Sequence, residues 1–301
     1  MAWRDLYPFT SHYFPLGPQR LHYLDEGPAD AEIAQPLLFV HGNPTWSFYW
    51  RNLIVALRDR WRCIAVDHIG CGMSDKPQTY DYTLARRIDD LVRLIEHLDL
   101  KATTLVAHDW GGAIGLGALR RLRQRFARIV LFNTGAFPPP FVPWRIAACR
   151  IPLVGTLAVR GLNAFAGAAL SMAVEKRERM TADVRAGLLA PYDSWTNRVA
   201  IDRFVKDIHF SPRHPTWRTL EQIEAGLPAL AEMPIQLIWG MRDWCFRPEC
   251  LDRFIGHWPA AEVHRLDECG HYVVEDAHER IAPLLRDFLQ RPGRLAGLTD
   301  S

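Results

Sequence analysis

The sequence lacks several features that would place it in other classes of protein. Its six cysteines form no CxxC pair and have no metal-like spacing with histidine, so they indicate reduced thiols rather than a disulfide framework or a metal site. The 36 Lys and Arg residues nearly balance the 34 Asp and Glu residues and form no basic tract, which argues against nucleic acid as a partner. No internal repeat indicates a solenoid or an array.

Long apolar runs are also missing. No window reaches the roughly 18 to 20 uninterrupted apolar residues of a membrane span. The most apolar stretch, residues 151–174, is broken by Arg160 and Asn163, and this composition suits either contact with a membrane surface or the wall of an apolar pocket. The N-terminal residues lack the charged start, apolar run and cleavage site of a secretory signal. We therefore expect a cytoplasmic protein with at most peripheral membrane contact.

The first half of the chain alternates short apolar runs with helical patterns. Residues 36–42, 62–70 and 103–109 are apolar runs that lead into loops, as buried parallel strands do, and residues 20–27 alternate like a half-exposed strand. Apolar residues between 84 and 98 keep helical spacing, with Thr83 as the cap. Strands alternating with helices in this way predict a parallel sheet with helices on both faces.

The alternation breaks near residue 137 and returns near residue 226. Residues 137–225 contain several helical stretches but no strong strand pattern, whereas two further strand and helix pairs follow them. The sequence therefore predicts an α/β core made of residues 1–136 and 226–301. A helical cap of residues 137–225 interrupts this core.

One turn in the core carries an unusual side chain. The strand 103–109 runs into HDWGG, a tight strand-to-helix turn that presents its central side chain beside free backbone N–H groups. Serine hydrolases have Ser at this place, but here it is Asp109. A carboxylate that attacks a saturated carbon gives a stable alkyl ester, whereas attack at an ester carbonyl gives an anhydride. Asp109 therefore predicts displacement at a saturated carbon.

Four other residues complete a candidate site. His271 follows the last strand as a candidate base, and Asp243 follows the preceding strand as the group that orients it. Asn43, in HGNP, closes an earlier strand, so we expect its N–H groups and those of Trp110 to bind a leaving anion. Each of these residues has an ordinary structural alternative: helix cap, loop, turn or core filling. The functional interpretation is stronger because all of them fall at the carboxyl ends of strands.

Five motifs together carry a family resemblance across nearly the whole chain: HGNPTWSFYWRNL, DHIGCGMSDKP, HDWGG, WGMRD and GHYVVEDA. They resemble the haloalkane dehalogenase-like branch of the α/β-hydrolases. With LAPYDSWTNRVAIDRFVKDI in the cap, the chain is most similar to the OleB family, the β-lactone decarboxylases of bacterial long-chain olefin biosynthesis. The resemblance implies a mostly parallel eight-stranded sheet with helices on both faces and an inserted cap. The order Asp109, Asp243, His271 is the nucleophile, acid, histidine order of that fold.

The resemblance also implies an activity. It predicts conversion of long-chain cis-β-lactones to cis-olefins and CO₂, with no metal or organic cofactor, and an assembly with the upstream β-lactone synthetase. In the scheme that we favour, Asp109 attacks the β-carbon with inversion while Asn43 and Trp110 hold the departing carboxylate. Anti elimination of CO₂ then expels Asp109, and His271 tunes the charge of the pocket. Attack at the lactone carbonyl is a competing route.

Three other functions remain open at this stage. A haloalkane dehalogenase would use the same residues, with His271 activating water. An epoxide hydrolase usually has a bulky residue in place of Asn43 and two cap tyrosines, whereas the cap tyrosine Tyr192 here is better explained as structural. A non-catalytic receptor commonly lacks one member of the set that this chain retains in full.

Overall fold

A central sheet of eight strands organises the computed structural model, which describes residues 2–28, 35–209 and 211–291. The strands are β1 (Ser11–Leu16), β2 (Gln19–Glu26), β3 (Leu37–Val40), β4 (Cys63–Val66), β5 (Thr103–Asp109), β6 (Phe126–Thr134), β7 (Ile235–Gly240) and β8 (Glu262–Leu266). Their order in the sheet is β1-β2-β4-β3-β5-β6-β7-β8, and all pairs from β4 to β8 are parallel. The predicted mostly parallel eight-stranded sheet is confirmed.

The two antiparallel strands at one edge differ from the sequence pattern. β2 has four consecutive buried residues, Leu21 to Leu24, so the predicted half-exposed alternation is wrong for it. The reason is β1, which we did not predict from its residues and which covers the edge of β2. Between β1 and β4, β2 is an interior strand packed on both faces, and such strands need no alternation.

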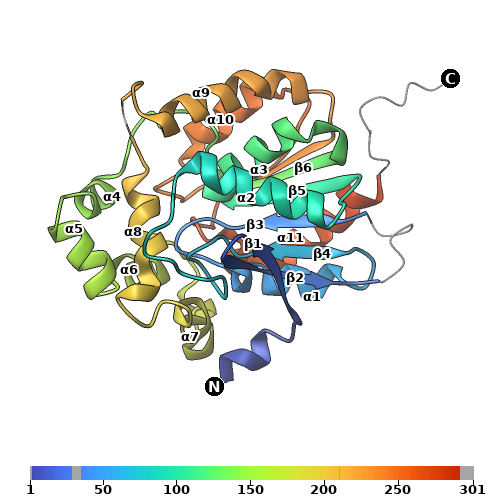
Figure 1. Ribbon diagram of the computed structural model, residues 1–301. Coiled ribbons are helices and arrows are strands. Elements are labelled where there is room, and N and C mark those ends of the chain that lie inside the picture. The colour runs from blue at the N-terminus through green and yellow to red at the C-terminus, as the bar shows by residue number, and fades with distance from the viewer. Residues whose placement is uncertain (1, 29–34, 210, 292–301) are drawn as a thin grey trace.

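Helices cover both faces of the sheet, as predicted (Figure 1). On one face, α1 (Arg51–Leu57) packs against α11 (Val273–Gln290). On the other lie α2 (Leu84–His97), α3 (Trp110–Arg121) and α10 (Pro248–His257). Thr83 caps α2 as expected, because its hydroxyl accepts a hydrogen bond from the backbone N–H of Arg86. Short helical turns also occur at η1 (Ala2–Leu6), η2 (Ser47–Trp50), η3 (Arg123–Arg125), η5 (Arg177–Arg179), η6 (Thr196–Arg198) and η7 (Leu227–Leu230).

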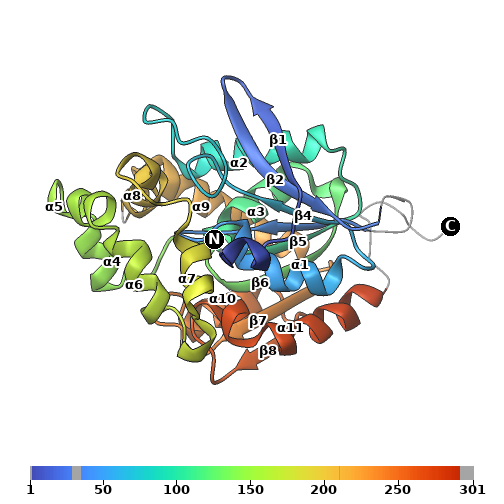
Figure 2. The same cartoon turned by 90° about the horizontal axis from the view of Figure 1, so that it is seen from below.

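The segment between β6 and β7 is helical, and its residues 144–206 lie to one side of the sheet (Figures 1 and 2). It contains α4 (Trp144–Cys149), α5 (Val154–Thr156), η4 (Leu157–Gly161), α6 (Ala164–Met172), α7 (Ala182–Leu189), α8 (Val199–Lys206) and α9 (Pro215–Gly226). The last of these, α9, packs on α2 and α3 of the core. The division at 136/137 and 225/226 stays a prediction, and residues 292–301 lie outside the described part. No described helix is long and apolar enough to span a membrane.

A buried ion pair joins α1 to the start of α11. The Arg51 guanidinium donates to both carboxylate oxygens of Glu275, at 2.5 and 2.8 Å, and Nη1 also donates to the carbonyl of Phe48 at 3.1 Å. Both charged side chains are almost fully buried, with 4% and 2% exposure. Because α11 begins two residues after His271, this pair braces the loop that carries the candidate base.

Arg51→Met should therefore destabilise the fold strongly. The substitution leaves the Glu275 carboxylate buried without its partner, a change that costs about 3 to 5 kcal/mol of unfolding free energy. Urea unfolding followed by circular dichroism measures this loss, and Arg51→Met/Glu275→Leu should recover most of it. As a control, Arg20→Met breaks an exposed pair with Asp75 and should cost at most about 1 kcal/mol. Equal losses of unfolding free energy in Arg51→Met and Arg20→Met would contradict the conclusion that the buried pair stabilises the fold more than the exposed one.

Candidate active site

Asp109 lies at a sharp turn between β5 and α3. Its backbone has φ 55°, a left-handed conformation that non-glycine residues rarely adopt and that often marks functional positions. Two glycines permit the close packing around it. A Cβ on Gly111 would collide with the carbonyl of Val40, and one on Gly42 would collide with the Asp109 carboxylate itself. The turn therefore holds this carboxylate against the loop after β3.

The Asp109 carboxylate is buried, and its two oxygens have different neighbours. Oδ1 accepts a hydrogen bond from the backbone N–H of Asn43 at 2.6 Å, whereas Oδ2 lies 3.7 Å from Nε2 of His271. Burial raises the pKa of Asp109 above its usual 3.8. The charge of His271 and the backbone N–H groups of Trp110 and Asn43 offset part of this rise. Oδ2 is therefore the oxygen available for attack.

His271 is held by Asp243, as the sequence predicts. Its Nδ1 donates to Oδ2 of Asp243 at 2.8 Å, and the other oxygen of Asp243 accepts from the backbone N–H of Cys245 at 2.6 Å. Burial alone would lower the pKa of His271, but the charge and hydrogen bond of Asp243, together with Asp109, outweigh it and leave the pKa raised. The site thus favours an imidazolium between two carboxylates.

Two buried polar residues hold the backbone near His271 and Asp243 but do not bond to either of these side chains. Nε2 of His108 donates to the carbonyl of His271 at 2.8 Å, which agrees with a supporting rather than a catalytic role. Asn133 lies at the end of β6 and is buried. Its amide exchanges two hydrogen bonds with the backbone of Gly240, at 2.9 and 2.8 Å. Asp243 is accordingly the carboxylate that bonds to His271.

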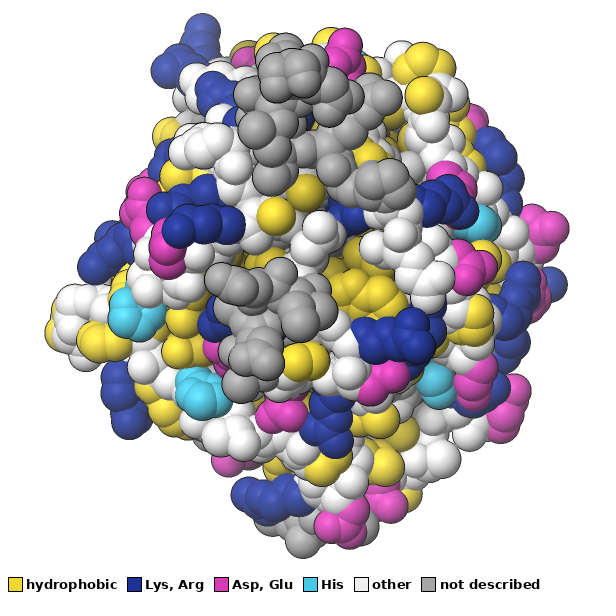
Figure 3. Space-filling model, turned by 90° about the vertical axis from the view of Figure 1, so that its right-hand side faces the viewer, with side chains coloured by type: hydrophobic (Ala, Val, Ile, Leu, Met, Phe, Trp, Pro, Cys, Tyr) yellow, Lys and Arg dark blue, Asp and Glu magenta, His cyan; other side chains and the backbone are white. Residues whose placement is uncertain are grey.

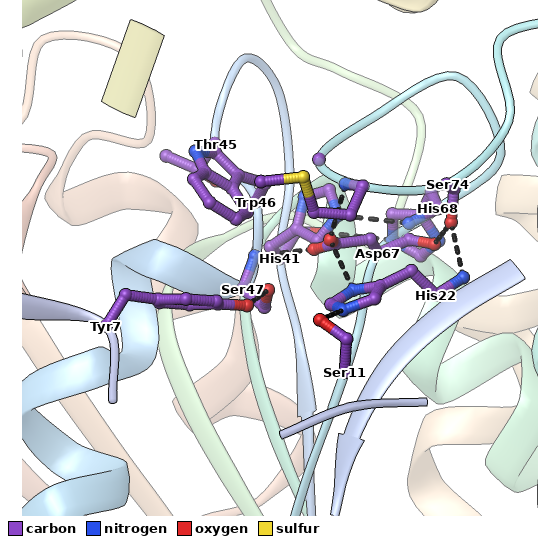
Figure 4. Close-up of polar contacts among 12 residues, drawn as sticks. Tyr7, Ser11, His22, His41, Thr45, Trp46, Ser47, Asp67, His68 and Ser74 are labelled. Carbon is purple, nitrogen blue, oxygen red and sulfur yellow. Dashed lines mark hydrogen bonds and ion pairs between the residues drawn. The ribbon is translucent and has the colours of Figure 1, made fainter. Parts of the chain in front are cut away.

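A buried polar cluster fixes the loop that carries Asn43 (Figure 4). Asp67 accepts a hydrogen bond from the backbone N–H of Ser47 at 2.7 Å. His68 donates to His41 twice, from its backbone N–H to Nε2 at 3.2 Å and from its own Nε2 to the carbonyl at 3.0 Å. Burial lowers the pKa of His41 to about 4, so this ring stays neutral at physiological pH. The cluster thereby holds the N–H of Asn43 against the nucleophile.

The anion-binding groups differ in part from the expectation. We predicted that the backbone N–H groups of Asn43 and Trp110 face the leaving group, but the structure directs both at the Asp109 carboxylate. The side chains remain as donors. Nδ2 of Asn43 donates to the carbonyl of Ile201 at 3.3 Å, and an amide nitrogen carries a second N–H. Trp110 packs on Phe204 and lines the cavity described next.

An apolar cavity of about 430 Å³ opens onto all four of Asn43, Asp109, Trp110 and His271. Its other walls come mainly from α4, α6 and the loop after β7: Ile146, Cys149, Phe165, Ala168, Ala169, Met172, Trp244 and Phe246. A second cavity of about 90 Å³ shares part of this lining and extends toward Phe137, Pro140 and Leu220. Both spaces are lined by Trp110, Ile146, Ile208, Cys245 and Phe246, whereas only the larger one is also lined by Asp109 and His271.

Part of this lining was not predicted from the sequence. Trp244, Cys245 and Phe246 follow Asp243 directly, and Phe246 stacks on the ring of His271 with centroids 5.7 Å apart. The signal was present, because two aromatic residues come right after a candidate acid at a strand end. By contrast, Tyr192 is buried and donates to the carbonyl of Thr45 at 3.2 Å, so the structural interpretation of this tyrosine is confirmed.

Asp243→Asn should lower the pKa of His271. The substitution removes the charge that does most to counter burial, so the imidazolium should lose its proton at a lower pH than in the wild type. An NMR titration of the His271 ring measures the shift. Asp267→Asn, which neutralises an exposed carboxylate on the loop before His271, is the matched control and should leave the pKa in place. An unchanged titration in Asp243→Asn would refute the charge balance given above.

Comparisons with known proteins agree with this geometry. Residues 35–152 match the α/β hydrolase fold family. The chain is 43% identical over 297 residues to cis-3-alkyl-4-alkyloxetan-2-one decarboxylases of Shewanella oneidensis (97% of this chain, 92% of the relative) and Xanthomonas campestris (95% and 97%). Haloalkane dehalogenase 2 of Mycobacterium tuberculosis is 33% identical over 293 residues, covering 92% of this chain and 94% of the relative.

Among solved structures, the haloalkane dehalogenase DatA of Agrobacterium tumefaciens has a TM-score of 0.83 and 25% identity, covering 93% of this chain and 96% of that one. The α/β-hydrolase fold expected from the motifs is confirmed. The higher identity to the decarboxylases than to the dehalogenases extends over almost the full length of the chain. The chain therefore belongs to the cis-3-alkyl-4-alkyloxetan-2-one decarboxylase family, within the haloalkane dehalogenase-like α/β-hydrolases.

Proposed function

We propose that this enzyme converts long-chain cis-β-lactones, the cis-3-alkyl-4-alkyloxetan-2-ones for which its relatives are named, to cis-alkenes and CO₂, with Asp109 as nucleophile. The observation that carries the proposal is a buried carboxylate at the wall of an apolar cavity. Oδ1 of Asp109 is occupied by the N–H of Asn43, and Oδ2 is left for the substrate. A carboxylate in such a place suits attack at a strained C–O bond.

In the first step Oδ2 forms a bond to the β-carbon of the lactone with inversion, and the bond between this carbon and the ring oxygen breaks. The products are an alkyl ester of Asp109 and a carboxylate on the neighbouring carbon. The side-chain N–H groups of Asn43 and Trp110 are the donors for that carboxylate. The raised pKa of His271 favours its charged form, which adds positive charge beside the developing anion.

In the second step CO₂ leaves. The electron pair of the bond to the carboxylate carbon becomes the double bond, and the ester C–O bond breaks and returns the pair to Oδ2 of Asp109. Inversion followed by anti elimination yields a cis-alkene from a cis-lactone. No water or external proton is consumed, so His271 and Asp243 act by holding charge in the pocket rather than by activating water.

Two neighbouring apolar cavities suit a substrate with two alkyl chains. The 430 Å³ cavity contacts the nucleophile and takes one chain beside it, and the 90 Å³ cavity on the other part of the Trp110 wall is our candidate for the second chain. Every methylene buried in such a pocket contributes about 0.8 kcal/mol. We further propose that the enzyme is located in the cytoplasm, in keeping with its six unpaired cysteines. We also propose that it assembles with the enzyme that forms the lactone, since a water-insoluble substrate is best transferred directly from one active site to the next.

Asp109→Ala should abolish alkene formation. Removing a covalent nucleophile lowers the rate by at least about a thousandfold. The assay follows the cis-alkene formed from a synthetic long-chain cis-β-lactone by gas chromatography, with Asp267→Asn as a control that should keep wild-type activity. Halide release from a 1-bromoalkane is measured beside it. Turnover of the bromide to the alcohol without any alkene from the lactone would overturn the proposal in favour of a dehalogenase.

An oxygen label tests the route. During turnover of the lactone in H₂¹⁸O, the Asp109 carboxylate should gain no ¹⁸O, because elimination breaks the ester on its alkyl side. Hydrolysis of an alkyl-enzyme would instead place solvent oxygen in Asp109, which mass spectrometry of the peptide detects. A label in the lactone ring oxygen should appear in rapidly trapped CO₂. Its absence from CO₂ would favour attack at the carbonyl carbon.

A further inference from the structure

The outer surface of α4, α5 and η4 exposes large apolar side chains, which we call the cap patch. Its members are Trp144, Ile151, Leu153, Val154, Leu157 and Leu162. Leu153 and Leu162 are 85% and 80% exposed, and Trp144 is 74% exposed. Single exposed apolar residues need no explanation, but six on one short stretch of a cap mark an interaction surface.

The charges on the chain segment that carries the cap patch have one sign. Residues 137–174 contain three arginines and no Asp or Glu. The guanidinium of Arg145 lies over the ring of Trp144, at 5.3 Å, and that of Arg160 lies over Trp195, at 4.7 Å. Neither pairs with a carboxylate in the described part of the chain. On the opposite side of the molecule, in contrast, basic and acidic side chains are interspersed (Figure 3).

The cap patch is continuous with the cavity of the active site. Trp144 belongs to both, because it is exposed on α4 and also lines the 430 Å³ cavity. Ala148 on α4 and Ala164 on α6 line the same cavity and are also exposed. Three exposed residues of α4 and α6 thus line the cavity at the edge of the patch, in the region that α4 to α6 form at one side of the molecule (Figure 2).

We propose that the cap patch docks on a lipid bilayer with anionic headgroups, so that the cavity opens toward the lipid. Aliphatic side chains of the patch enter the boundary between headgroups and acyl chains, and Arg145 and Arg160 lie at the phosphate level. Trp144 is of the type that favours this boundary. The inference rests on the proposed function, because a lactone and an alkene with long alkyl chains both concentrate in lipid.

Flotation with vesicles tests this proposal on the full chain. The wild type should float with vesicles of phosphatidylcholine and phosphatidylglycerol, less with phosphatidylcholine alone, and less at high salt, which screens the arginines. Leu153→Glu/Leu157→Glu should reduce the bound fraction by at least about tenfold. The control is Val55→Glu, which places one such glutamate at a half-exposed apolar position of α1 and should bind like the wild type.

The proposal is overturned if the wild type stays unbound with both kinds of vesicle, or if the double variant floats as the wild type does. It is also overturned if sedimentation without vesicles shows a dimer that the double variant abolishes, since a second copy would then cover the patch. Alkene formation from a short-chain cis-β-lactone dissolved in buffer separates this question from the proposed function. The double variant should keep that rate, and a wild type inactive on this lactone would count against the proposed function but leave the flotation result valid.

Discussion

The contact between the N–H of Asn43 and the carboxylate of Asp109 is the constraint on which the site depends. It fixes one oxygen of a buried carboxylate and leaves the other facing the cavity and His271. The bond exists only because the loop after β3 comes close enough, which requires Gly42, and because the cluster around Asp67 holds that loop. A buried carboxylate without these donors would take up a proton more readily.

The charges of the site explain why one framework can serve different reactions. His271 lies between Asp243 and Asp109, and these two carboxylates raise its pKa against the effect of burial. A dehalogenase needs this ring neutral in order to activate water, whereas the elimination proposed for the lactone needs only positive charge near the nucleophile. The apolar lining of α4 and α6 supports the second route, since it limits the water available beside an alkyl ester.

The cap has one face toward the active-site cavity and one face toward the outside of the molecule. Its inner face, with Phe165 and Met172, lines the cavity, while Leu153 and Leu157 on its outer side are exposed. The composition of residues 151–174 is compatible with two roles, a membrane contact or a pocket wall. The structure divides the stretch: α6 lines the pocket, whereas residues 151–162, in and around α5 and η4, carry most of the exposed large apolar side chains.

The sequence by itself determined the alternation of strands and helices, the turn at Asp109, and the order of Asp109, Asp243 and His271. These are local signals, because each depends on a short pattern and on the rule that parallel strands end at one edge of the sheet. Only the tertiary structure decided which hydrogen bonds these residues make. It turned the N–H of Asn43 onto the nucleophile, placed β1 beside β2, and brought Phe246 onto His271. Such contacts depend on how distant segments pack in three dimensions, and no local pattern of residues encodes that packing.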